Sequence, residues 1–321
     1  DIDAARKARC TPEGRSVVME YDPITLLTER ALAGGLLDTT YAYDHRGRLT
    51  AATVGSRTTS FGYTSRGFLG SVVDPLGRQT HYEYDAVGRI SGITRPDGSL
   101  VDFAYDGNGN MTALVNPAGV AHRFGYNRVN AGREYAAPLS GGYQYRYDRD
   151  RRPTEFVLPS GKIIRNVYDR GLLARTETPE GDIYFNYLCG SKLGSIGKGG
   201  ETIAYAYDGF LPASETSSGT LNHTATYSYD NDFELIQASY AGEATGYGYD
   251  RDGLLTQAGD FSIARDAASG LPLQVSGAGL QVNRAFNGYG ELESQAAAVG
   301  WRELSAYSLL RDGAGTIVRK R

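Results

Sequence analysis

The sequence has few cysteines, methionines, tryptophans and histidines, and it has no long apolar run. Its 321 residues include two cysteines, two methionines, one tryptophan and four histidines. No apolar stretch approaches the roughly 18 residues of a membrane span, and residues 1–10 lack the apolar segment of a signal peptide. We therefore expect no membrane insertion, and any targeting segment would lie outside these residues.

The sequence also lacks a large excess of either sign of charge. The 33 basic and 37 acidic side chains are spread along the chain and leave a formal net charge of −4. No basic block could neutralise a series of phosphates, so nucleic acid is excluded as an expected partner.

Tyrosine and glycine, in contrast, are abundant, with 24 and 42 copies. Aromatic rings pack well on a pleated strand, and glycine supplies the positive φ that tight turns need. The composition therefore favours strands and turns over helices.

A Tyr-Asp pair recurs at single or double multiples of about 21 residues. The nine pairs begin at Tyr21, Tyr43, Tyr84, Tyr105, Tyr147, Tyr168, Tyr207, Tyr229 and Tyr249. Degraded copies occupy the skipped places, at Tyr63-Thr64, Tyr126-Asn127, Tyr187-Leu188, Arg265-Asp266, Phe286-Asn287 and Arg311-Asp312. The chain is thus an array of about fifteen repeats.

Each repeat has the pattern of a β-hairpin. Tyr82 and Tyr84 lie two residues apart and so share one face of a strand. The Asp-x-x-Gly that follows places Asp first and Gly fourth in a turn, where the carboxylate accepts backbone N–H bonds and the glycine adopts a left-handed conformation. The residues that represent this structural motif are Tyr43, Asp44, Gly47, Tyr84, Asp85, Gly88, Tyr105, Asp106, Gly109, Tyr249, Asp250 and Gly253.

The strand that returns from this turn has apolar residues three apart, as at Ile90 and Ile93. A β-bulge in each returning strand would restore both to one face. A second turn with a Pro-x-Gly element, such as Asp74–Gly77 or Arg95–Gly98, then closes the repeat.

These features predict an all-β fold, a long antiparallel meander of about fifteen β-hairpin repeats. About 30 strands at about 4.8 Å spacing give a sheet about 145 Å wide, which must coil because open sheets rarely exceed about ten strands. We expect a curved, hollow shell or spiral, with possible self-association through its open sheet edges. Residues 1–258 are predicted to form the regular array, and residues 259–321, where the spacing becomes irregular, to continue or cap it.

No catalytic, cofactor-binding or metal site is predicted. The four histidines belong to different repeats, and no nucleophile is paired with a base. Equivalent aspartates of successive hairpins would lie about 9.6 Å apart, whereas calcium requires its oxygen ligands within about 2.6 Å. Cys10 and Cys189 are interpreted as two free buried thiols, because a disulfide between them would require the array to curl back on itself. The aromatic stripe is interpreted as packing between hairpins, with sugar binding as the alternative.

The motif and its spacing resemble the RHS or YD-repeat family. The segments that match are Tyr41-Ala-Tyr-Asp-His-Arg-Gly-Arg-Leu49, Tyr82-Glu-Tyr-Asp-Ala-Val-Gly-Arg-Ile90, Tyr249-Asp-Arg-Asp-Gly-Leu-Leu255 and Asn287-Gly-Tyr-Gly-Glu-Leu292. The resemblance implies a spiral of β-hairpins that forms a hollow shell. In bacterial toxins of this family the shell encloses a C-terminal toxic polypeptide, and in teneurins it is an extracellular scaffold.

We therefore predict a structural segment of a β-shell in a secreted or cell-surface bacterial protein, without enzyme activity. It would enclose or scaffold a toxin-like or other polypeptide cargo, and its partners would be neighbouring repeats or cargo of the same protein. Family shells are longer than this chain, and it has no recognisable self-cleaving segment or toxin domain, so we expect part of a shell. The alternative is an extracellular adhesion or carbohydrate-binding repeat module.

Overall fold

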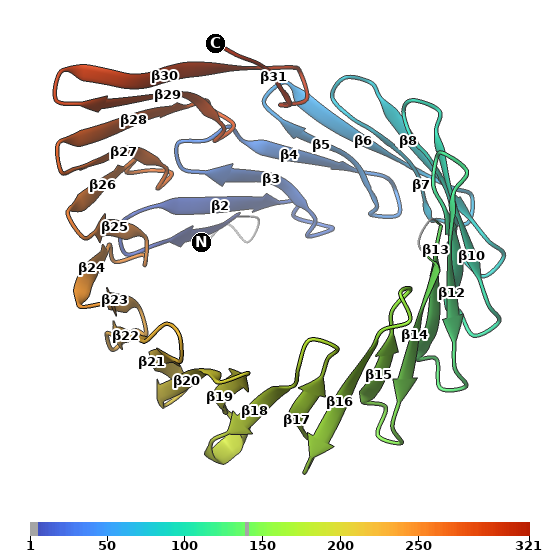
Figure 1. The fold of residues 1–321 in the computed structure, drawn as a ribbon. Coiled ribbons are helices and arrows are strands. Elements are labelled where there is room, and N and C mark those ends of the chain that lie inside the picture. The colour runs from blue at the N-terminus through green and yellow to red at the C-terminus, as the bar shows by residue number, and fades with distance from the viewer. Residues whose placement is uncertain (1–5, 139–140) are drawn as a thin grey trace. The chain divides into compact units, whose positions relative to one another are not determined.

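The computed structural model describes residues 6–138 and 141–321, and these contain 31 β-strands and one short 3₁₀ helix (Figure 1). Strands consecutive in the chain pair side by side and antiparallel, as in β4–β5, β5–β6 and β6–β7. The predicted all-β antiparallel meander of hairpin repeats is therefore confirmed.

The chain divides into two compact units, and one of them is discontinuous in sequence. Unit 1 comprises residues 1–81 and 245–321, and unit 2 comprises residues 82–244. Strands β8 and β24 each cross a boundary between the units.

Unit 1 contains the first and the last hairpins of the chain. Its N-terminal strands, through the shared strand β8, are β1 (Arg6–Cys10), β2 (Ser16–Tyr21), β3 (Thr28–Ala33), β4 (Thr39–Tyr43), β5 (Leu49–Val54), β6 (Arg57–Tyr63), β7 (Leu69–Val73) and β8 (Gln79–Tyr84). Its C-terminal strands, from the shared strand β24, are β24 (Glu243–Tyr249), β25 (Leu255–Ala258), β26 (Phe261–Arg265), β27 (Pro272–Gly277), β28 (Leu280–Phe286), β29 (Leu292–Val299), β30 (Arg302–Arg311) and β31 (Ile317–Lys320).

Unit 2 contains the most regular repeats. Its strands are β9 (Ile90–Thr94), β10 (Leu100–Tyr105), β11 (Met111–Val115), β12 (Ala121–Tyr126), β13 (Gly132–Ala137), β14 (Gly141–Tyr147), β15 (Pro153–Val157), β16 (Ile163–Asp169), β17 (Leu172–Glu177), β18 (Ile183–Tyr187), β19 (Leu193–Lys198), β20 (Glu201–Asp208), β21 (Leu211–Ser218), β22 (His223–Tyr229) and β23 (Leu235–Tyr240), with the 3₁₀ helix η1 (Cys189–Ser191) between β18 and β19.

A β-bulge follows the motif turn in repeat after repeat. In β10–β11, Ala104 pairs with Ala113 but Tyr105 pairs with Met111, so Thr112 is the extra residue of the returning strand. The same shift occurs in β4–β5, β14–β15, β22–β23 and β28–β29. The bulge predicted for the returning strand is therefore confirmed where these pairings are described.

The sheet has almost no dry core of its own. Strands such as β22 and β28 alternate between half-buried and exposed side chains, as expected of a strand with one better-covered face. Among the described residues, Val101 (8% exposed) is the only buried hydrophobic side chain. A single layer of hairpins thus leaves much of its apolar surface only half covered.

Candidate functional site

The motif aspartate forms the turn of its repeat with both its backbone and its carboxylate. Asp44 Oδ1 accepts the backbone N–H groups of Arg46 (2.8 Å) and Arg48 (3.0 Å), while Asp44 O accepts the Gly47 N–H (2.9 Å). Gly47 has φ 74°, in the left-handed region that glycine adopts without strain. The sequence therefore encodes this turn in two of its four residues.

The other motif aspartates occupy equivalent positions. Asp85 accepts N–H bonds from Val87 and Arg89, Asp106 from Asn108 and Asn110, and Asp250 from Asp252 and Leu254. The glycines that end these turns, Gly88, Gly109 and Gly253, have φ of 91°, 91° and 75°.

The arginine that follows the motif glycine connects two repeats. Arg48 Nε donates to Asp44 Oδ2 of its own turn at 2.8 Å, and its guanidinium lies 4.3 Å from the ring centre of Tyr63 in the next repeat. This arginine lowers the pKa of Asp44 to about 2, first through its side-chain hydrogen bond and then through backbone N–H donation. Arg89 and Arg152 make the same pair of contacts, with Asp85 and Tyr105 and with Asp148 and Tyr168.

The motif tyrosine links its repeat to the preceding one. Tyr105 Oη donates to the Ile90 carbonyl at 2.8 Å, and Ile90 is the first residue of the preceding returning strand β9. Equivalent bonds to carbonyls 14 or 15 residues earlier are made by Tyr43, Tyr63, Tyr126, Tyr168, Tyr187 and Tyr207. The tyrosine stripe is thus occupied in holding successive hairpins together, which supports its interpretation as packing.

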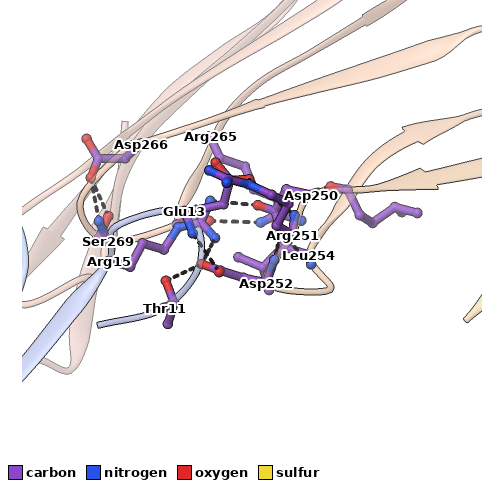
Figure 2. Close-up of polar contacts among 12 residues, drawn as sticks. Thr11, Glu13, Arg15, Asp250, Arg251, Asp252, Leu254, Arg265, Asp266 and Ser269 are labelled. Atoms are coloured by element: carbon purple, nitrogen blue, oxygen red, sulfur yellow. Dashed lines mark hydrogen bonds and ion pairs between the residues drawn. The ribbon is translucent and has the colours of Figure 1, made fainter. Parts of the chain in front are cut away.

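A second contact surface lies within unit 1, between the closing turns of its N-terminal segment and the motif turns of its C-terminal segment. We call it the row contact and define it by residues 11–15, 34–37 and 55–57 on one side and residues 250–254, 266–270 and 287–291 on the other. Arg15 donates to Asp250 Oδ2 at 2.7 Å and to Asp252 Oδ2 at 2.5 Å (Figure 2).

Further polar groups of the same closing turn complete this part of the row contact. Thr11 Oγ1 and the Glu13 backbone N–H donate to the Asp252 carboxylate at 2.6 and 3.0 Å, and Glu13 pairs with Arg251 at 2.9 Å (Figure 2). The Arg15 side chain is 14% exposed and those of Asp250 and Asp252 are 11% and 7% exposed. The hydrogen bond from Arg15 is the main cause that lowers the pKa of Asp250.

A second arginine crosses the row contact at the Asn287 turn. Arg57 donates from both terminal nitrogens to the Glu291 carboxylate, at 2.7 and 3.1 Å, and its guanidinium lies 3.6 Å from the ring centre of Tyr289. Tyr289 Oη also contacts the backbone N–H and hydroxyl of Ser56. The bidentate geometry is the strong form of an arginine–carboxylate pair, and it holds the pKa of Glu291 below its usual value.

Apolar groups and backbone also make contacts across the row contact. Leu37 N–H donates to the Gly288 carbonyl at 2.7 Å, and a Cβ on Gly288 would come within 3.0 Å of Leu37 Cγ. A Cβ on Gly34 would likewise meet the Ala268 carbonyl at 2.9 Å. Glycine in these turns therefore allows the two rows to approach closely.

Sequence reasoning did not find the arginines of the row contact. The residues that its side-chain hydrogen bonds join are 233 to 241 apart, so no local pattern joins them. The Asp250 and Asn287 turns have Leu254 and Glu291 where the Asp44, Asp85 and Asp148 turns have their own arginine, but other turns, such as those of Asp106 and Asp230, also lack it. The Asp250 and Asn287 turns each take an arginine from the N-terminal segment.

The two cysteines are free, as predicted, but both are exposed, so their assignment as buried thiols is wrong. Cys10 is the last residue of strand β1 and Cys189 the first residue of η1, so each lies at the end of an element beside a turn, where side chains are commonly exposed. His122 Nδ1 lies 2.7 Å from Tyr135 Oη, so this histidine is part of the packing of β12 and β13.

Within residues 6–138 and 141–321, no three His, Cys, Asp or Glu side chains gather as a metal ion would require. In the same part of the chain, no helix has the length and apolar character of a membrane span.

The hairpin repeats, their tyrosine links and the row contact define the chain as a β-shell repeat protein. The teneurin YD-shell family matches residues 11–320, and the chain belongs to this family. No match to this chain was found among curated proteins.

Solved toxin structures share this fold. The chain is similar to the Photorhabdus luminescens Tc holotoxin pore with a substituted TccC3 (TM-score 0.78, 14% identity, 96% of this chain and 20% of that chain). It is also similar to TcdB2-TccC3-TEV (TM-score 0.70, 12% identity, 96% and 22%) and to TcdB2-TccC3-Cdc42 (TM-score 0.70, 12% identity, 98% and 23%). The chain thus spans between 20% and 23% of the length of these structures.

Proposed function

We propose that this chain is a structural, non-catalytic segment of a shell that encloses or scaffolds a polypeptide cargo, toxin-like or other, of the same protein. The observation that carries the proposal is a sheet with a single buried hydrophobic side chain, Val101, among its described residues. Apolar surface that a sheet leaves half covered is normally covered by another layer, and a polypeptide held against the sheet would supply that layer.

Membership of the YD-shell family and the fold shared with Tc toxin structures support this role. They also support a secreted or cell-surface protein of a bacterium. Residues 259–321 are proposed to continue the array of residues 1–258, because their hairpins keep the same antiparallel pairing and bulges.

The tyrosines do not favour the alternative of a carbohydrate-binding module. A sugar platform needs ring faces open to solvent, whereas Arg48, Arg89 and Arg152 each lie over the ring of a motif tyrosine. The hydroxyls of the same tyrosines bond to backbone carbonyls.

Protease protection of a cargo tests the proposal. An unfolded reporter polypeptide joined after Arg321 should be cleaved by trypsin at least about tenfold more slowly than the same reporter joined to a compact globular carrier, because local exposure limits cleavage. Equal rates of cleavage in the two fusions would count against enclosure.

A further inference from the structure

Two exposed phenylalanines lie on neighbouring motif turns of unit 2. Phe210 is 92% exposed and Phe233 is 74% exposed. Together with Asp208, Asp230 and Asn231 they line an open hollow of about 910 Å³. Large aromatic side chains that are presented in this way typically mark an interaction surface.

The exposed Phe233 also has a strained backbone conformation. Phe233 occupies the position of the motif glycine and has φ 66°, in the left-handed region that a side chain with a Cβ rarely adopts. The equivalent positions of the Asp85 and Asp250 turns are the glycines Gly88 and Gly253. Asn130 (φ 60°) and Arg151 (φ 65°) hold the same position in other motif turns, so what distinguishes Phe233 is an apolar ring presented to solvent from a strained position.

The turn that contains Phe233 has the acceptor arrangement of a turn in the row contact. Asp230 Oδ1 accepts the N–H groups of Asp232 and Glu234, each at 2.9 Å, as Asp250 Oδ1 accepts those of Asp252 and Leu254 at 2.9 Å. Both turns read Asp-x-Asp. In unit 1 the second aspartate of that pattern, Asp252, binds Thr11, Glu13 and Arg15 of a closing turn.

We propose that the Phe210 and Phe233 turns of unit 2 dock a closing turn from a second copy of this chain. A cationic side chain of that turn lies against Asp230 and Asp232, and its apolar side chains lie against the two phenylalanine rings. The surface offers the kind of contact that the Asp250 turn already makes, and its acidic and aromatic groups complement a turn that presents an arginine and an apolar side chain.

The chain itself presents a closing turn with this chemistry. Arg95-Pro-Asp-Gly98 has the Pro-x-Gly form of the Thr11–Arg15 turn, with the exposed Arg95 in the place of Thr11 and Asp97 in the place of Glu13, and the nearby Leu100 is 41% exposed. A second copy therefore supplies both the cation and the apolar surface. The proposal does not depend on the identity of any cargo.

Sedimentation of the 321-residue chain tests the proposal. Self-association is expected between about 1 and 100 µM, and Phe233→Gly or Asp232→Lys should each raise the dissociation constant at least about tenfold. Phe233→Gly restores the motif residue and relieves the strained φ, so its thermal midpoint should be equal to or above that of the wild type.

Ile24→Ser is the matched control, because Ile24 is an 88% exposed apolar side chain on a motif turn of unit 1, away from the proposed surface in the sequence. It should associate like the wild type. A wild-type chain that stays monomeric at about 100 µM, or association that persists unchanged in both Phe233→Gly and Asp232→Lys, would overturn the proposal.

Discussion

At the scale of single residues, a tyrosine hydroxyl joins each of several hairpins to the preceding one by a hydrogen bond. The β-bulge leaves backbone groups beside it without a partner in the ladder, and the tyrosine of the next repeat donates to the carbonyl of the first residue of the returning strand. At Tyr105 this bond joins β10 to Ile90 of β9 at 2.8 Å. One side chain thus covers the neighbouring hairpin with its ring and satisfies a backbone acceptor with its hydroxyl.

Removing that hydroxyl tests its contribution. Tyr105→Phe keeps the ring but leaves the Ile90 carbonyl without its donor, and it should lower the free energy of unfolding by about 1 kcal/mol in urea titration. Tyr240→Phe is the control, because Tyr240 is 58% exposed and its ring packs against that of His223 with 4.8 Å between the ring centres. If both variants lose the same stability, the hydroxyl bond has no special role.

The motif aspartates predict how stability depends on pH. The Arg48 hydrogen bond lowers the pKa of Asp44 from 3.8 to about 2 in the folded state. A lowered folded pKa means that the ionised carboxylate stabilises the fold, so its contribution is present above about pH 3.8 and is lost as the pH falls towards about 2. The same direction holds for Asp85, Asp106, Asp148 and Asp250.

Urea midpoints measured from pH 6 to pH 2 check this expectation. The wild type should lose stability across that window, and Asp44→Asn should lose less across it while starting from a lower midpoint. Parallel curves for the two proteins would show that Asp44 does not contribute to the acid sensitivity.

At the scale of the hairpin, the two turns and the bulge act together. The motif turn reverses the chain, the bulge after it twists the returning strand, and the Pro-x-Gly turn passes the chain to the next repeat. Backbone hydrogen bonds close both turns, for example from Gly47 to Asp44 and from Gly77 to Asp74. A hairpin of this kind has no core of its own and is stabilised by its neighbours.

Two glycines of one turn, Gly107 and Gly109, allow the effect of backbone conformation on stability to be distinguished from the effect of packing. Gly109 has φ 91°, whereas Gly107 in the same turn does not have a left-handed φ and a Cβ there would meet no atom within 4 Å. Gly109→Ala should therefore cost about 1 kcal/mol of folding free energy, and Gly107→Ala should be neutral or slightly stabilising. Thermal unfolding of the two variants side by side measures the difference, and equal midpoints would contradict the assignment.

Local features of this fold could be predicted from the sequence because a few neighbouring residues determine each of them. Proline and glycine set the closing turn at residues 95–98, and the apolar spacing at Ile90 and Ile93 predicts the bulge. Exceptions such as Phe233, with positive φ in a glycine position, could not be predicted from turn propensity. The exposure of Cys10 and Cys189 was missed because apolar residue type predicts burial only where a core exists.

At the scale of the whole molecule, long-range pairs hold distant parts of the sequence together within unit 1. The repeat period could not predict these pairs. Every repeat has a similar turn, so the sequence gives no basis for deciding which two turns lie against each other. Leu254 and Glu291 hold the position at which some motif turns have their own arginine, but Asn110 and Glu234 do so too, so this position does not reveal the pairing with Arg15 and Arg57.

The pair of Arg57 and Glu291 allows a direct measurement of the row contact. Their side chains are 16% and 24% exposed and the pair is bidentate, so a double-mutant cycle with Arg57→Ala and Glu291→Ala should give a coupling of about 1 kcal/mol. Arg165 and Glu155, with side chains 51% and 14% exposed, form the comparison pair in unit 2 and should couple more weakly. Coupling no larger than that of the comparison pair would mean that the row contact adds little.

The row contact also depends on the number of repeats that separate its two sides in the sequence. The residues joined by its side-chain hydrogen bonds lie 233 to 241 apart, roughly eleven periods of the array, and Arg15 reaches Asp250 only when that many repeats intervene. Loss of one hairpin between residues 58 and 249 would set Arg15 against the Asp266 turn, which lacks the second aspartate of the Asp-x-Asp pattern. The number of repeats between residues 58 and 249 therefore determines which turn lies opposite Arg15. We expect natural deletions of a hairpin to fall outside this interval.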